Sequence, residues 1–163
     1  DEYRAALTVF PRADRGLVEE MYGSAFTPAM LDAIGEAIRS RTVRGSSLVS
    51  TVGRTSEGGA IPQAADYLLN LEGITTVLVY GLVGETVRLS ARSTDSRVDI
   101  ADALRAAFGD VGQVGGHNDM SGGQIPLGLF ADHGDDDPAL LPFVGNRVRG
   151  RFFDVMHLDE GDR

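Results

Sequence analysis

Two short segments of the sequence carry groups suited to bind an anion, and the first of them is rich in glycine. It contains Gly115, Gly116, His117, Asn118 and, slightly later, Ser121. Paired glycines let successive backbone N–H groups turn toward a ligand because no Cβ stands in the way, and such a turn forms an anion-binding concavity. The imidazole of His117 and the hydroxyl of Ser121 add two further donors. We predict that this segment binds a phosphate; the alternative is a flexible loop with a surface histidine.

The second segment is Ser90-Ala91-Arg92-Ser93, at the end of a predicted strand. A guanidinium at a strand end can grip a phosphate through two parallel hydrogen bonds, and the hydroxyl of Ser93 would assist. The alternative is a solvated charge at the end of a strand. We expect Arg92 and Ser93 to form the second side of the phosphate site.

The sequence offers little for bond cleavage. It has no cysteine, no G-x-S-x-G nucleophile motif and no Walker loop. The nearest approach to a metal cluster is Asp132-His133 followed by residues 135–137, all aspartate, and acids at the N-terminus of a helix are explained by the helix dipole without a metal. His157 is expected to be a surface or packing residue. We therefore assign no catalytic residue, no metal ligand and no cofactor to this chain.

The charged residues of this sequence are unusual in kind and in balance. The 163 residues carry a net charge of -9, with 24 acids, and all 15 basic residues are arginine. Such a charge would argue against nucleic-acid binding, but concentrated salt screens acidic surfaces, and we expect a haloarchaeal protein whose charge reports its habitat. No apolar run approaches the roughly 20 residues needed to cross a bilayer, and the chain opens with charged residues. We expect a cytoplasmic location and no membrane partner.

Periodicity and turn residues predict a mixed α/β fold with about five strands flanked by helices. Strands are expected at 3–10, 47–52, 74–80, 86–91 and 124–130, and helices at 14–22, 28–41, 61–71, 99–108 and after Pro138. Residues 112–123 are predicted to be a glycine-rich loop. Thr27 followed by Pro28 marks a clear helix start, and this helix would connect the domain to a preceding part of the protein.

Taken together, the two chemical segments resemble the DHHA1 domain, the C-terminal substrate-binding domain of DHH-family phosphoesterases. That family shows S-x-R-S at a strand end, then a helix, then a G-G-H-x-x-(A/S)-(A/S)-G loop, and the same order occurs here. The resemblance covers roughly residues 45–130 and includes the helix with Asp66. Val114 stands where the family has a third glycine, and Met120 where it has a small residue, which leaves the exact ligand open.

The resemblance implies a phosphate-bearing nucleotide or short oligonucleotide as ligand. It also implies an N-terminal DHH domain, absent from this chain, in which Asp and His residues bind two Mn²⁺ or Mg²⁺ ions. Residues 1–27 would then be the tail of that domain or a linker, 28–45 the connector helix, and 46–163 the DHHA1-like domain. Two alternatives stay open: a non-catalytic regulatory module that binds nucleotides or nucleic acid, and a purely structural domain. A homodimer is compatible with the phosphoesterase reading and with both alternatives.

Overall fold

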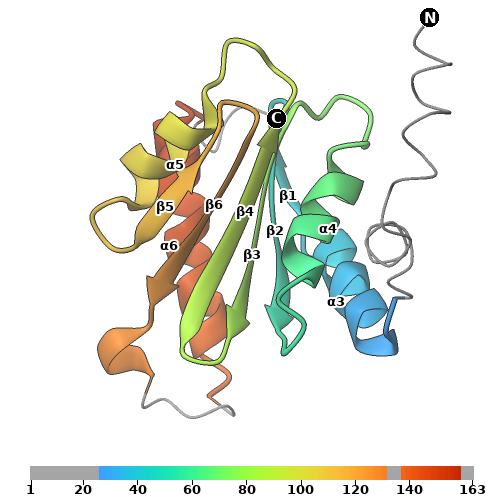
Figure 1. The fold of residues 1–163 in the computed structure, drawn as a ribbon, viewed down its shortest axis with the longest axis vertical. Helices are drawn as coiled ribbons and strands as arrows, with labels where there is room; N and C mark the ends of the chain where they lie inside the picture. The colour runs from blue at the N-terminus through green and yellow to red at the C-terminus, as the bar shows by residue number, and fades with distance from the viewer. Residues whose placement is uncertain (1–25, 132–136, 159–163) are drawn as a thin grey trace, which may run out of the picture.

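The computed structural model describes residues 26–131 and 137–158. Six strands form one mixed sheet in the order β1-β2-β3-β4-β6-β5 (Figure 1). The strands are β1 (Thr42–Arg44), β2 (Ser47–Arg54), β3 (Thr76–Val83), β4 (Thr86–Ser93), β5 (Gln113–Gly116) and β6 (Met120–Pro126). Within this sheet β2 and β3 pair in parallel, and the other neighbours are antiparallel. The predicted class is confirmed, with a sheet of six strands in place of about five.

Within the described part of the chain, four helices cover the two faces of this sheet. They are α3 (Pro28–Arg39), α4 (Ala60–Leu68), α5 (Ile100–Phe108) and α6 (Leu140–Val155), and a 3-10 turn, η2 (Gly128–Phe130), follows β6. Helices α3 and α4 pack on one face, and α5 and α6 pack on the other (Figure 1). Two hydrophobic cores result, one on each side of the sheet, and β2 and β3 contribute side chains to both.

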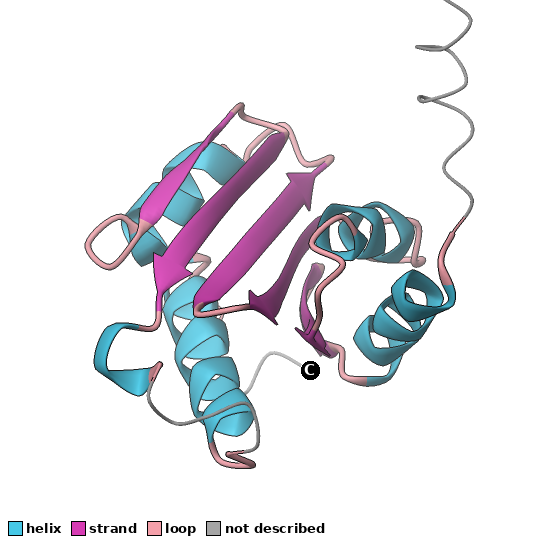
Figure 2. Cartoon of the chain, turned by 60° about the horizontal axis from the view of Figure 1, so that its bottom comes forward, coloured by secondary structure: helices cyan, strands magenta, loops and turns pink. Residues whose placement is uncertain are grey.

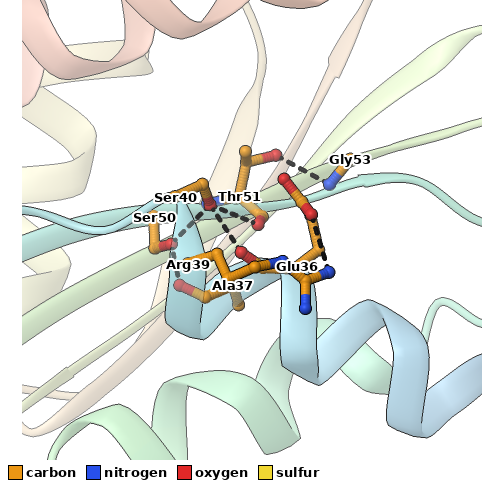
Figure 3. Close-up of polar contacts among 7 residues, drawn as sticks. All are labelled: Glu36, Ala37, Arg39, Ser40, Ser50, Thr51 and Gly53. Atoms are coloured by element: carbon orange, nitrogen blue, oxygen red, sulfur yellow. Dashed lines mark hydrogen bonds and ion pairs between the residues drawn. The ribbon is translucent and has the colours of Figure 1, made fainter.

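Helix α3 is joined to the sheet by the hydroxyl groups of Ser40, which is partly buried, and Ser50, which is buried. Its N-cap is Thr27, whose side chain accepts a hydrogen bond from the backbone of Met30, as predicted. At its other end, Ser40 Oγ lies 2.9 Å from the carbonyl oxygen of Thr51, and Ser50 Oγ donates to the carbonyl of Ala37 (Figure 3). These bonds fix the direction in which α3 leaves the sheet.

The loop predicted at residues 112–123 is wrong for most of its length, because residues 113–116 and 120–123 belong to strands. They form most of a hairpin in which β5 pairs with β6, and β6 pairs with β4. Glycine is normally depleted in strands, but here close packing requires it: a Cβ on Gly123 would lie 2.6 Å from Val114 Cγ1. Val114 and Ile125 meanwhile pack against the α5/α6 core, and this burial outweighs the weak strand propensity.

Other predictions differ in detail. The helix predicted at 61–71 is Ala60–Leu68, and Gly73, five residues past its last residue, has a left-handed backbone with φ 81°. The strand predicted at 124–130 lies earlier, at Met120–Pro126. The strand at 3–10, the helix at 14–22 and the segment 132–136 lie outside the described residues. Among those that are described, no helix is long and apolar enough to cross a membrane.

Candidate phosphate-binding site

Strand β4 presents alternating side chains to the two faces of the sheet. Val87, Leu89 and Ala91 belong to the core beneath α5 and α6. Because successive strand residues point to opposite faces, Arg88, Ser90 and Arg92 face the side that carries α3 and α4. A row of polar groups therefore follows β4 on the face where the two helices cover only part of the sheet.

The guanidinium of Arg92 is the most tightly held group in this row. Arg92 is 8% exposed, which excludes the solvated strand-end charge. Its Nε donates to Asp66 Oδ1 of α4 at 2.7 Å, and its Nη1 donates to Ser90 Oγ and to the Ala91 carbonyl, each at 3.0 Å. Among the described residues, no hydrogen bond of its Nη2 is found beside those of Nε and Nη1.

The Gly115-Gly116-His117 segment runs out of β5 into a tight turn beside the end of β4. The backbone N–H of His117 donates to the Met120 carbonyl at 2.7 Å. The turn is also bonded to its surroundings: Ser93 N–H donates to the Asp119 carbonyl at 2.9 Å, and Ile100 N–H donates to the Asn118 carbonyl at 3.0 Å. The backbone of β4's last residue, the start of α5 and this turn thus hold one another in place.

Gly116 is required by this geometry. Its φ is 152°, and a Cβ at this position would lie 2.4 Å from the Met120 carbonyl oxygen and 2.5 Å from Ser121 Cα. Only glycine lets the two strands approach so closely. Gly115 is different, because a Cβ there would meet nothing within 4 Å. The pair is therefore one structural glycine and one glycine that opens onto the surface.

The structure brings the predicted residues to one end of the sheet but gives them different surroundings. Register pairing places Arg92 beside Met120, one residue before Ser121, and His117 and Asn118 are exposed at the turn. Ser93 and Ser121 are buried: Ser121 Oγ donates to the Gly115 carbonyl at 3.0 Å, and Ser93 Oγ lies 3.0 Å from Thr76 Oγ1. The hydroxyls expected to assist a phosphate are thus engaged inside the protein.

A cleft of about 420 Å³ continues from this end along the open face of β4, β6 and β5. Its base includes glycines of β5 and β6, namely Gly115, Gly122 and Gly123, and Pro62 of α4 stands at its side. Figure 2 shows this part of the sheet facing the viewer without a helix over it, with α3 and α4 standing to one side. The cleft forms because these glycines on the adjacent strands β5 and β6 carry no side chains.

Sequence reasoning missed Arg88, which lines the same cleft. It lies four residues before Arg92 on the same strand face, and the alternation of β4 could have found it. Arg88 is exposed, and no hydrogen bond or ion pair of its guanidinium occurs in the part of the chain that the structure describes. Its Nη1 lies beside Gly58, and a Cβ added to Gly58 would be 2.7 Å from this nitrogen.

The loop after β4 is stiffened by a charge pair. Asp95 accepts hydrogen bonds from Nε and Nη2 of Arg97 at 2.9 and 2.7 Å, and from the backbone N–H of Arg97 at 3.0 Å. These bonds hold the pKa of the Asp95 carboxyl at about 2, below the ordinary 3.8. Across residues 26–131 and 137–158, His, Asp and Glu side chains form no group of three or more that could hold a metal.

Comparison with known proteins identifies the domain. The family model of the DHHA1 domain matches residues 44–136, more than half of the chain. The chain belongs to the DHHA1 family. It is also 30% identical over 163 residues to an uncharacterized protein of Methanocaldococcus jannaschii. That alignment includes 99% of this chain and 33% of the relative, so the chain spans about one third of the relative's length.

Solved structures share the DHHA1 fold. An exopolyphosphatase-related protein of Bacteroides fragilis superposes with a TM-score of 0.59 at 13% identity, over 95% of this chain and 44% of that protein. RecJ of Thermus thermophilus, solved with Mn²⁺, gives a TM-score of 0.51 at 16% identity, over 80% of this chain and 17% of RecJ. At such identities the likeness concerns the fold. In this chain the strand end with Arg92 and the turn with His117 lie side by side, and their neighbours Ser90 and Gly115 line the cleft.

Proposed function

We propose that this chain is the substrate-binding half of a metal-dependent DHH phosphoesterase, and that it holds the phosphates of a nucleotide or short oligonucleotide. The observation that supports the proposal is that the Arg92 strand end and the Gly115–His117 turn lie side by side in a DHHA1 domain, next to a glycine-floored cleft that Ser90 and Gly115 line. Cleavage would occur in a separate DHH domain using Mn²⁺ or Mg²⁺. The Mn²⁺ of RecJ is in line with this assignment.

The proposed binding mode follows from the donors that the structure leaves free. Nη2 of Arg92 and the imidazole of His117 would contact a phosphate from two sides, with Asn118 beside them. Asp66 positions Arg92 by holding its Nε, and a charge-assisted bond to a fixed guanidinium costs little ordering on binding. For Ser93 and Ser121 we propose positioning roles, because their hydroxyls already bond inside the protein.

Two roles remain for the parent protein. In the first it cleaves its ligand; in the second it is a regulatory module that only binds. The described residues offer no metal-binding group, so both predict that this chain alone binds nucleotides and hydrolyses nothing. Turnover of a dinucleotide with Mn²⁺ by the purified chain would contradict the proposal. Asp-His-His and its partner aspartates upstream of Asp1 in the gene would favour the first role.

The binding test replaces an exposed residue so that folding is preserved. Titration calorimetry with 5′-AMP compares the unmodified chain with His117→Asn and with His157→Asn as a matched control. Both histidines are exposed, and asparagine tolerates the left-handed backbone of His157, whose φ is 55°. We expect His117→Asn to weaken binding about fivefold, the value of an exposed charged contact, and His157→Asn to leave it unchanged. Equal effects of both replacements would refute the site.

A further inference from the structure

A groove of about 580 Å³ lies on the other face of the sheet, between the end of β6 and helix α6 (Leu140–Val155). Val87 of β4 lines it and belongs to the core beneath α5 and α6, so this groove and the cleft described above are on opposite faces. Most of the lining is apolar, and it includes Phe108, Val111, Ile125, Leu127, Phe143 and Val148. A concave site of this volume with an apolar lining is the usual form of a small-ligand site.

The charged residues that line the groove are two arginines of α6. Arg151 is engaged: its Nη1 and Nη2 donate to the two carboxylate oxygens of Asp110 at 2.6 and 3.1 Å, and Nη1 also donates to the Ala107 carbonyl at 2.8 Å. Arg147 is exposed, and within residues 26–131 and 137–158 its guanidinium has no hydrogen bond or ion pair. Its Cζ lies 5.7 Å from the centroid of the Phe143 ring, and this contact holds the charge at the groove. The groove thus offers one uncommitted positive charge beside an apolar lining.

The groove is elongated along α6. Its lining residues on this helix run from Phe143 to Arg151, which at 1.5 Å per residue is a length of about 12 Å. Such a shape suits an unbranched alkyl chain that lies along the helix. The α6 wall also lies outside residues 44–136, which the DHHA1 family model matches. The groove is therefore separate from the phosphate site proposed above.

The charges at the groove argue against two other kinds of occupant. A twofold contact between copies brings one patch against itself, so the exposed Arg147 of one copy would lie near the same residue of the other. Among the described residues, no Asp or Glu lines the groove to compensate. A cationic ligand would be repelled in the same way. An anionic head group joined to an apolar chain matches both the guanidinium and the lining.

We infer that the groove between β6 and α6 binds an amphiphilic monocarboxylate with an unbranched alkyl chain, such as a medium-chain fatty acid. The carboxylate accepts hydrogen bonds from the guanidinium of Arg147, and the chain lies against the apolar residues of β6 and α6. Removal of the chain from water supplies most of the affinity. The inference goes beyond the proposed function and does not depend on it, since the phosphate site is on the opposite face.

The test uses ligands that differ in head group or in chain length alone. Octanoate, octylamine as its cationic counterpart, and decanoate are titrated below their micelle concentrations into the full 163-residue chain. The dissociation constants are measured by ¹H–¹⁵N NMR at one salt concentration, since salt screens the charge of an exposed arginine.

The proteins are the unmodified chain, Arg147→Ala, and Arg105→Ala as matched control. Arg105 is an exposed arginine of α5, paired with Asp102 and outside the groove, so it controls for the loss of one positive charge. Alanine is the best helix former, so both helices tolerate the replacement.

The unmodified chain should bind octanoate more tightly than octylamine, although its net charge of -9 attracts the cation. Arg147→Ala should weaken octanoate binding about fivefold, as expected for one exposed ionic contact, and Arg105→Ala should leave it unchanged. Decanoate should bind roughly fivefold more tightly than octanoate, because two further methylene groups become partly buried. The shifted signals should include Val111 and Val148, which line the groove.

Several results would overturn the inference. They are equal affinities for octanoate and octylamine, equal effects of the two arginine replacements, or no saturable shift at the groove with any of the three ligands. A dimer in sedimentation equilibrium that Phe143→Ser converts to a monomer would make the groove an interface between two copies, and would overturn it as well. Binding of 5′-AMP reports on the opposite face, so the proposed function stands or fails separately.

Discussion

Replacing Gly115 and Gly116 one at a time should show that Gly116 is needed for stability and that Gly115 affects ligand binding. In Gly116→Ala the new Cβ would lie 2.4 Å from the Met120 carbonyl oxygen and 2.5 Å from Ser121 Cα, and both obstacles are backbone atoms. The φ of 152° adds a conformational cost of about 1–3 kcal/mol. Relief requires β5 to move away from β6, which loses at least one backbone hydrogen bond, worth about 1 kcal/mol.

The sum is a destabilisation of about 3 kcal/mol for Gly116→Ala, or a Tm lower by roughly 6–12 °C for a protein of this size. Gly115→Ala is the matched control, since its Cβ meets nothing within 4 Å. It should stay within about 1 kcal/mol of the unmodified chain, because alanine costs less conformational entropy than glycine. Its methyl group instead protrudes at the cleft and should weaken AMP binding.

Urea denaturation followed by circular dichroism, at one salt concentration, gives both free energies of unfolding. The reasoning predicts a clear gap between the two variants, with Gly116→Ala the less stable. If the free energies of unfolding of the two variants differ by less than about 0.5 kcal/mol, which is the range of ordinary surface substitutions, then the close approach of β5 and β6 does not require glycine at position 116.

Two further predictions concern charges around β4. Asp66→Asn removes the anionic partner of Arg92, which is 8% exposed, so we expect a loss of about 1 kcal/mol in the free energy of unfolding and weaker AMP binding. Asp102→Asn, which breaks an exposed ion pair within α5, is the control. Equal losses in the two variants would contradict a special role for Asp66. The pKa of Asp95 is held at about 2, so its stabilising contribution is present above the unfolded pKa of 3.8 and disappears as the pH falls toward 2. Arg97→Ala should raise the Asp95 pKa toward 3.8, measured by NMR titration of the carboxyl carbon; an unchanged pKa would rule out Arg97 as its cause.

The elements predicted well from sequence are those in which a local signal and burial agree. Thr27 before Pro28 and Asp99 before Ile100 mark helix starts because the caps act within one turn, and the structure has both. The apolar run in β3 predicts a strand inside the sheet, and the structure confirms it, because nearly every residue of β3 is buried. Such signals depend on neighbouring residues and need no knowledge of distant partners.

The hairpin of β5 and β6 could not be predicted in the same way. Gly116 and Gly123 are explained by the close approach of β5 to β6, and Gly122 by the Leu89 carbonyl oxygen of β4. These contacts exist only once the strands have paired. For the same reason, the sequence could place Arg92 near His117 only through the family resemblance. That Ser93 and Ser121 point into the interior follows from the pairing register, and one residue of register decides which face a side chain takes.

The residues that contact a bound nucleotide can be mapped directly by NMR. Amide and arginine Nε signals would be followed by ¹H–¹⁵N NMR while 5′-phosphorylated ApA is added. We expect saturable shifts at residues 115–118 and at the side chain of Arg92, with little change in α6 (Leu140–Val155). Saturable shifts confined to α6 and the far face of the sheet, or no saturable shift with the dinucleotide in large excess, would contradict it.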